Sequence, residues 1–120
     1  MNRGDRVMVM RLMGIETEYG LSHVRAGGPD QDDDAIRREL LSVAMKRFPF
    51  LPAGQGKGIF LGNGSRFYID CGGHPEYCTP EVENPREVVR YAEAGAEVLH
   101  DVASELTRER QDGTELLLFR

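Results

Sequence analysis

The sequence lacks tryptophan, contains only two cysteines, and carries no excess of positive charge. The two cysteines, Cys71 and Cys78, are too few for a disulfide framework and predict a reducing, cytoplasmic setting. A net charge of −5 argues against a surface that binds nucleic acid through its phosphates. No hydrophobic run approaches the ~20 residues that cross a bilayer, which argues against a membrane protein. Arg11 interrupts the apolar stretch near the N-terminus, which argues against a secretory signal.

The 120 residues suffice for one small domain with a hydrophobic core. Apolar spacing predicts the order strand, helix, hairpin, helix, strand, which is an α+β fold with a largely antiparallel sheet. The expected strands are residues 6–13, 15–24, 59–61, 65–70 and 114–120. The expected helices start at the acidic run 30–34 and at Asn84, and they end near residues 48 and 110. Residues 52–58 are expected to form a loop, and the last strand to be buried.

Residues 65–79 concentrate an arginine, two acids, a histidine and two tyrosines. Arg66, Tyr68 and Asp70 alternate with apolar residues, so on a strand they share one face. The glycine pair that follows allows a sharp turn, which returns Glu76 toward the end of this strand. Two carboxylates brought together need a cation or a shared proton. The pattern therefore favours a metal or phosphate site over a plain strand–turn–strand.

Two more acids, Glu16 and Glu18, would also share one face of a strand. Like charges at this spacing repel unless water or a cation separates them. An exposed strand face is the simpler interpretation of the pair taken alone. The alternative is a pair of oxygen ligands for Mg²⁺, which prefers one or two carboxylates together with substrate phosphates.

Three segments, residues 13–20, 61–70 and 74–77, closely resemble the start of the Pup ligase and Pup deamidase family. These bacterial proteasome accessory factor A-like enzymes are glutamine synthetase-like carboxylate–amine ligases. The resemblance implies the N-terminal part of a glutamine synthetase-like fold, a mostly antiparallel sheet packed by two helices. The family's catalytic domain is several times longer, so residues 1–120 are expected to be its incomplete N-terminal portion. As an isolated piece the chain is expected to be inactive.

The resemblance implies ATP and Mg²⁺ as cofactors and assigns a role to each residue that matches a family motif. The implied metal residues are Glu16, Glu76, Tyr68 beside the ion, and Glu18 as a second ligand or supporting acid. The implied ATP contacts are Arg66 and Thr79, and the implied catalytic residue is Asp70. His74 is expected to support the turn. Cys71 and Cys78 stand where relatives commonly have small residues, and neither is expected to touch the acidic residues.

The implied activity is ligation of the C-terminal glutamate of Pup, a small prokaryotic ubiquitin-like tag, to lysines of target proteins in the bacterial proteasome pathway. A γ-glutamyl phosphate would activate the glutamate. The deamidase or depupylase of the same family is the alternative. The deamidase relatives carry a long extra loop within the interval that residues 21–60 fill here with one helix and a short loop, so the ligase is preferred. A zinc module built on Cys71, His74 and Cys78, or a non-catalytic interaction domain, are further alternatives.

Overall fold

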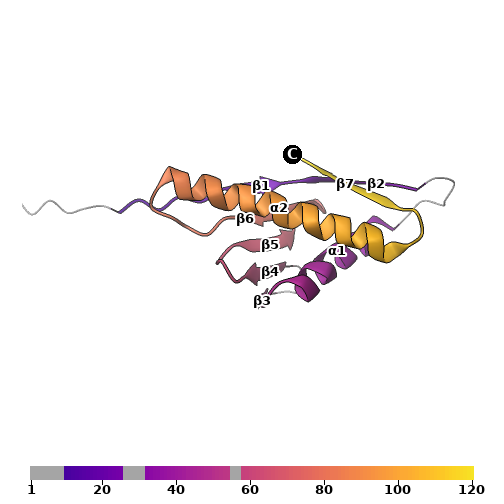
Figure 1. Ribbon diagram of the computed structural model, residues 1–120. Helices are drawn as coiled ribbons and strands as arrows, with labels where there is room; N and C mark the ends of the chain where they lie inside the picture. The colour runs from indigo at the N-terminus through magenta and orange to yellow at the C-terminus, as the bar shows by residue number, and fades with distance from the viewer. Residues whose placement is uncertain (1–9, 26–31, 55–57) are drawn as a thin grey trace, which may run out of the picture.

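The chain folds into an antiparallel sheet of five strands, a second sheet of two strands, and two helices (Figure 1). The computed structural model describes residues 10–25, 32–54 and 58–120. The larger sheet has the strand order β1-β6-β5-β4-β3, and the smaller sheet pairs β2 with β7. The strands are β1 (Glu16–Glu18), β2 (Gly20–Val24), β3 (Phe50–Ala53), β4 (Gly58–Leu61), β5 (Arg66–Ile69), β6 (Pro75–Cys78) and β7 (Glu115–Phe119). This confirms the α+β class with a mostly antiparallel sheet and two helices, as expected for the N-terminal part of a glutamine synthetase-like fold.

The first helix, α1 (Asp33–Arg47), begins where the acidic run supplies a cap. The side chain of Asp32 accepts hydrogen bonds from the backbone N–H groups of Asp34 and Ala35, at 2.9 and 3.2 Å. These bonds satisfy two of the donors that the first turn of a helix leaves without an internal partner. The expected core stripe is confirmed, since Ile36, Leu40, Val43 and Ala44 are all buried.

The second helix, α2 (Pro85–Arg110), begins at the predicted cap, where the Asn84 side chain accepts from the backbone N–H of Glu87 at 3.0 Å. Pro85 occupies the first turn, where its missing N–H costs no hydrogen bond. The helix ends at Arg110, as predicted, and its C-cap residue Gln111 takes the left-handed conformation with φ of 48°. Within the described ranges, neither helix has the length and apolar character that a bilayer span requires.

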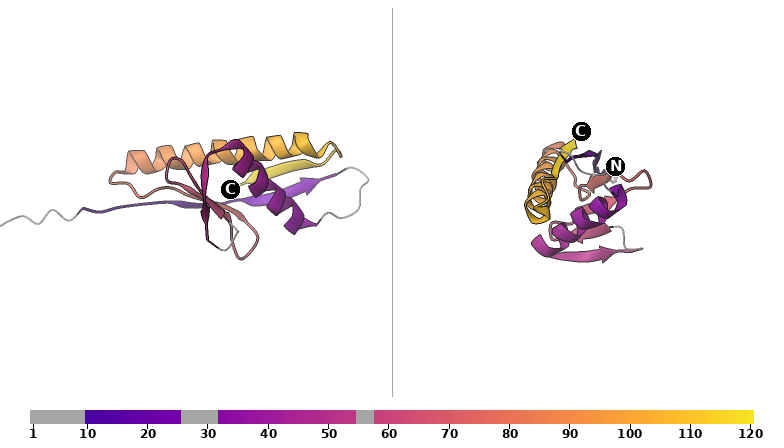
Figure 2. Two further views of the ribbon diagram at one scale, coloured as in Figure 1. Left: turned by 90° about the horizontal axis from the view of Figure 1, so that it is seen from below. Right: turned by 90° about the vertical axis from the view of Figure 1, so that its right-hand side faces the viewer.

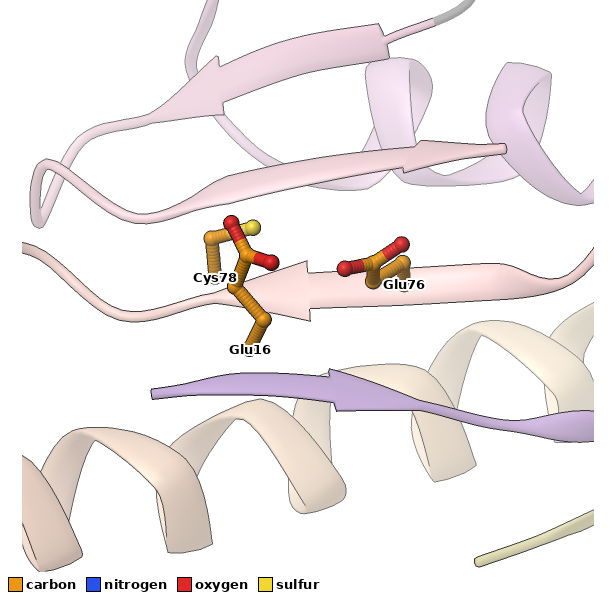
Figure 3. Close-up of side chains that lie close together, drawn as sticks. All are labelled: Glu16, Glu76 and Cys78. Atoms are coloured by element: carbon orange, nitrogen blue, oxygen red, sulfur yellow. The ribbon is translucent and has the colours of Figure 1, made fainter. Parts of the chain in front are cut away.

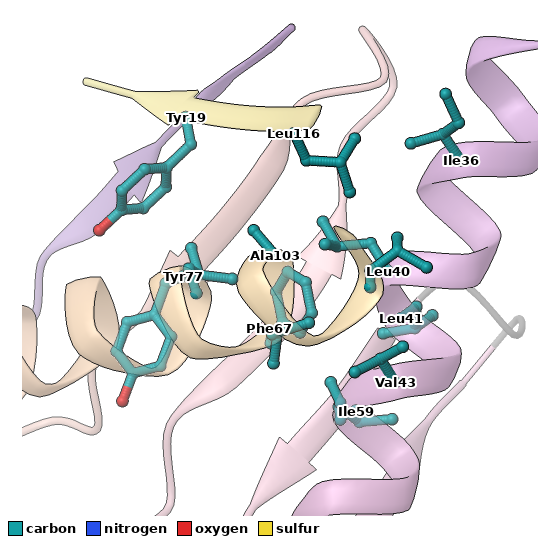
Figure 4. Close-up of a cluster of buried hydrophobic side chains, with 14 of the residues drawn as sticks. Tyr19, Ile36, Leu40, Leu41, Val43, Ile59, Phe67, Tyr77, Ala103 and Leu116 are labelled. Atoms are coloured by element: carbon teal, nitrogen blue, oxygen red, sulfur yellow. The ribbon is translucent and has the colours of Figure 1, made fainter. Parts of the chain in front are cut away.

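The core lies between the helices and one face of the larger sheet (Figures 2 and 4). Ile59, Phe67 and Tyr77 pair across β4, β5 and β6, so their side chains line this face, and all three are buried. Helix α2 comes so close to the sheet that a side chain at Gly95 would meet the Tyr77 ring at 2.3 Å. Both helices therefore cover one face of the sheet and leave the alternate residues of each strand on the other face.

Three expectations about the sheet are wrong for the residues that the structure describes. Residues 6–9 of the predicted first strand lie outside the described residues, and of residues 10–13 only Met13 pairs, through an isolated bridge to Val82. Part of the predicted loop 52–58 belongs to β3. This strand tolerates Pro52 because it lies at the edge of the sheet and has a partner on one side only. Residues 55–57 of that loop lie outside the described residues. The last strand, β7, is buried only at Leu116, because the two-stranded sheet leaves its alternate residues exposed.

Candidate active site

The face of the larger sheet opposite the helices carries two rows of polar side chains across β1, β6 and β5. In the first row the pairing brings Glu16, Cys78 and Arg66 side by side. In the second row it brings Glu18, Glu76 and Tyr68 side by side. The central strand β6 thus joins acids from β1 to the arginine and tyrosine of β5, although these segments lie about fifty residues apart in the chain.

Glu16, Glu76 and Cys78 form a compact cluster in which one ligand atom from each lies within 4.8 Å of the other two (Figure 3). The two β6 residues are two positions apart, so both side chains leave the strand on the same side. The carboxylate of Glu16 reaches from β1 over the same face and lies beside the Cys78 sulfur. The arrangement offers two oxygen donors and one sulfur donor to a cation.

Glu76 is the buried acid of this cluster, with only 9% of its surface exposed. Among the described residues no lysine, arginine or histidine forms an ion pair with it. Burial, followed by a hydrogen bond with Glu76, raises the pKa of Tyr68 above its ordinary value, so this phenol stays neutral. A buried carboxylate is costly unless it is paired with a cation or coordinates a metal. The surroundings of Glu76 therefore suit a bound cation.

Arg66 supplies positive charge on the same face. Its guanidinium stacks over the ring of Tyr68 with 4.2 Å between the guanidinium carbon and the ring centroid. Its buried Nε atom has no hydrogen-bond partner, and within the described part of the chain Arg66 forms no ion pair with the neighbouring acids. An arginine that is held in place but has an unused donor suits an anionic ligand such as a phosphate.

Asp70 and His74 close the turn between β5 and β6. The backbone N–H of His74 donates to Oδ1 of Asp70 at 2.7 Å, and the His74 Nδ1 lies 3.2 Å from Oδ2. The backbone hydrogen bond from His74, with the contribution of its ring, lowers the pKa of Asp70 below the ordinary value. Gly73 permits the turn with φ of +83°. The result is an ionised, oriented carboxylate at the end of β5.

Thr79 has a role in the sheet that the sequence did not indicate. Its hydroxyl oxygen accepts a hydrogen bond from the Ile15 backbone N–H at 3.0 Å, and its own N–H donates to the Ile15 carbonyl at 2.9 Å. These bonds tie the end of β6 to the start of β1, just beside Glu16. The implied ATP contact of Thr79 stays a prediction, and its hydroxyl hydrogen remains available for it.

One expectation about an individual side chain is corrected by the geometry, and one stays a prediction. Glu18 pairs with Glu76 across the sheet and also belongs to a second cluster with Asp70 and His74, in which the His74 Nδ1 is 3.1 Å from a Glu18 oxygen, so its role as a second ligand or supporting acid stays a prediction. Cys78 does touch the acidic residues, contrary to expectation. Its spacing from Glu76 on one strand was the signal that sequence reasoning missed.

The zinc module on Cys71, His74 and Cys78 lacks the required geometry. His74 and Cys78 belong to separate clusters, and Cys71, which is exposed, belongs to neither among the described residues. These three residues lie within eight positions of the chain, but the turn and the strand direct the His74 and Cys78 side chains into separate clusters and leave Cys71 exposed.

Replacing His74 by alanine is expected to raise the pKa of Asp70 toward its ordinary value of 3.8. The shift is partial, because the backbone N–H of residue 74 still donates to the carboxylate when the ring is gone. Since the folded-state pKa of Asp70 is depressed, its contribution to stability is present above the unfolded-state pKa and is lost as the pH falls through the folded value. In the variant this loss begins at higher pH.

A carboxyl-carbon NMR titration of the 120-residue chain measures this shift. Asp112 is the control, since hydrogen bonds from Thr114 lower its pKa to about 2 and do not involve His74. An Asp70 titration that is identical in both proteins would contradict the predicted effect of the imidazole.

The sequence and the fold both match known proteins. The family model described as "Pup-ligase protein" matches residues 11–120. The chain is 38% identical over 99 residues to a Pup–protein ligase of Kocuria rhizophila, which covers 82% of this chain and 20% of that relative. It is 34% identical over 116 residues to the Pup–protein ligase of Mycolicibacterium smegmatis, which covers 94% of this chain and 24% of the relative.

A solved structure agrees with these relatives. The crystal structure of the complex between the prokaryotic ubiquitin-like protein Pup and its ligase PafA superimposes with a TM-score of 0.73 at 30% identity, over 92% of this chain and 21% of that chain. This chain therefore spans about a fifth of the length of the curated relatives it matches. Because the family model covers nearly the whole of it, the chain belongs to the Pup ligase family.

Proposed function

We propose that this chain supplies the acidic metal site, the phosphate-binding arginine and the catalytic aspartate of an ATP- and Mg²⁺-dependent Pup–protein ligase. The reaction joins the C-terminal glutamate of Pup to lysines of target proteins, which commits them to the proteasome pathway. The observation that carries the proposal is the convergence of Glu16 and Glu76 beside Arg66, with Asp70 at the end of the same strand. The names of the relatives support the choice of Pup as the substrate.

The residues present fit a magnesium ion. Glu16 and Glu76 offer hard oxygen ligands, and one or two carboxylates with phosphate oxygens are what Mg²⁺ prefers. Tyr68, which stays neutral, orients Glu76 through their hydrogen bond. When bound, Mg²⁺ with ATP supplies the phosphoryl group that turns the glutamate carboxylate of Pup into a good acylating agent. Arg66 would offer its positive charge to the nucleotide phosphates, where negative charge develops during transfer.

Asp70 acts on the incoming lysine. A lysine has a pKa of ~10.4, so presenting it neutral at pH 7 costs roughly 4–5 kcal/mol. The ionised carboxylate of Asp70 cannot remove that proton in advance, because its own pKa is low. It attracts and orients the ammonium, and an Asp70 oxygen takes the proton as the nitrogen–carbon bond forms and the nitrogen becomes acidic. The bond between the glutamate carbonyl carbon and the phosphate oxygen breaks in the same exchange, and inorganic phosphate leaves.

We expect the complete activity to require residues besides those of this chain. The chain spans about a fifth of the length of the curated relatives, so residues 1–120 are the N-terminal portion of the catalytic domain in this proposal. The ATP base pocket and the Pup groove would come from the remainder. The isolated chain is therefore expected neither to hydrolyse ATP nor to ligate Pup.

The test incubates the full-length protein that carries this segment with ATP, Mg²⁺ and Pup ending in either glutamate or glutamine. Conjugates on target lysines from the glutamate form, absent without Mg²⁺, are the expected result. Release of ammonia from the glutamine form without conjugation would replace the ligase with the deamidase. Neither product from a protein that is folded would overturn both assignments.

A further inference from the structure

Cys78 places a sulfur atom inside the group of acids that the proposed function assigns to magnesium. Its Sγ and one oxygen each of Glu16 and Glu76 lie within 4.8 Å of one another. Cys78 is half-buried and pairs across the sheet with both Glu16 and Arg66, so its thiol is held on the site face (Figure 3). The ligase chemistry described above has no use for this thiol.

A second observation points to a cation at this position. Glu76, with 9% of its surface exposed, directs its carboxylate into the cluster, where Tyr68 is a hydrogen-bond partner but no cationic side chain of the described ranges pairs with it. Glu16 brings a second negative charge to the same place. Two carboxylates at this separation repel each other unless a cation lies between them.

We propose that Glu16, Glu76 and Cys78 form a binding site for a thiophilic divalent cation of the Zn²⁺ class. Zinc takes cysteine sulfur and carboxylate oxygen as ligands, and three protein donors with an open fourth position are typical of accessible zinc sites. Magnesium gains nothing from sulfur, since it requires oxygen ligands in octahedral geometry. The sulfur atom thus selects for zinc over magnesium at a site whose carboxylates serve both ions.

Binding requires the thiol to lose its proton. The negative charge of Glu16 and Glu76 beside the sulfur favours a divalent cation, which replaces the proton on sulfur. One proton passes to solvent for each ion bound, and a metal–sulfur bond forms in exchange.

The site uses the same two carboxylates as the proposed magnesium site, so zinc and magnesium compete for it. The inference does not depend on Pup ligation, because it concerns the metal affinity of the chain alone. Occupation by zinc would take up the two carboxylates that the proposed function assigns to magnesium, which makes Cys78 a point of inhibition by thiophilic metals.

The experiment titrates the metal-free 120-residue chain with Co²⁺, the spectroscopic substitute for Zn²⁺, under reducing conditions. The expected result is a near-ultraviolet thiolate-to-cobalt charge-transfer band that saturates at one ion per chain. Zn²⁺ is expected to remove the band stoichiometrically, whereas an equal concentration of Mg²⁺ leaves it unchanged. Replacement of Glu76 by glutamine is expected to weaken Co²⁺ binding at least about tenfold.

Matched variants identify which of the two cysteines supplies the metal-binding sulfur. Cys78→Ser and Cys78→Ala are expected to lose the band, while Cys71→Ala, which alters the exposed cysteine outside the cluster, keeps it. Circular dichroism of each metal-free variant checks that it is folded, and the serine variant preserves the side-chain size where alanine leaves a gap. A band that survives in folded Cys78→Ser, that disappears in Cys71→Ala, or that equimolar Mg²⁺ abolishes would overturn the proposal. None of these results depends on whether the full-length protein ligates Pup.

Discussion

Replacing Asp70 by asparagine in the full-length protein is expected to lower the rate of Pup ligation by about 10²–10⁴-fold. Asparagine keeps the shape of the side chain and can still accept the hydrogen bond that the His74 backbone N–H donates to residue 70. It has no negative charge to attract the lysine ammonium and cannot accept its proton. Single-turnover assays with saturating ATP and Mg²⁺ measure the rate of conjugate formation, and equilibrium binding measures the affinity for ATP.

The affinity for ATP is expected to change little, since the metal cluster at Glu16 and Glu76 does not include Asp70. The matched control is Asp101→Asn, which removes the same charge from an exposed position on α2, where Asp101 pairs with Arg47. Ligation at the wild-type rate by Asp70→Asn would remove this residue from the mechanism. Equal loss of activity in both variants would attribute the effect to charge or stability alone.

Replacing Phe67 by alanine is expected to lower the free energy of unfolding by about 3–5 kcal/mol. Phe67 is fully buried at the centre of the face between Ile59 and Tyr77, where it contacts the core under both helices (Figure 4). Truncation loses the transfer free energy of the ring and leaves a cavity that the surrounding sheet cannot fully close. Urea denaturation followed by circular dichroism measures the loss.

Phe60→Ala is the matched control for this prediction. Phe60 lies on the neighbouring strand β4 but on the opposite face, where it pairs with Arg66, and 44% of its surface is exposed. Its truncation removes the same ring from a position that water already reaches, so the expected loss is below about 1 kcal/mol. Comparable destabilisation by the two variants would show that the core does not lie on the side of the sheet described here.

Local signals in the sequence predicted the helices well. Asp32 and Asn84 act as caps because their short side chains accept hydrogen bonds from the first turn, an effect that depends on only a few neighbouring residues. The buried stripes of α1 and α2 follow from apolar residues at helical spacing. The alternation around Phe67 likewise separated core residues from site residues on β5.

The strands were harder to predict where pairing decides their extent. Residues 50–53 include Pro52 and form a strand only because they pair with β4. The pairing tolerates the proline because β3 is an edge strand and its ladder with β4 does not require an N–H at Pro52. Leu117 and Phe119 are apolar yet exposed, because β7 pairs with β2 in a small sheet and not within the larger one. Neither outcome is encoded in the residues of the segment alone.

The order of residues along the chain was sufficient to determine the two helices, the turn at Gly73, the charges available for a site and, through three short motifs, the family. Which donors meet was decided only by the folded sheet. Glu16 lies beside Cys78 and Glu76, and Glu18 lies beside Asp70 and His74, because β1 pairs with β6 in one particular register. Register is a property of long-range backbone hydrogen bonding and core packing, and a shift of one residue would turn every one of these side chains to the opposite face.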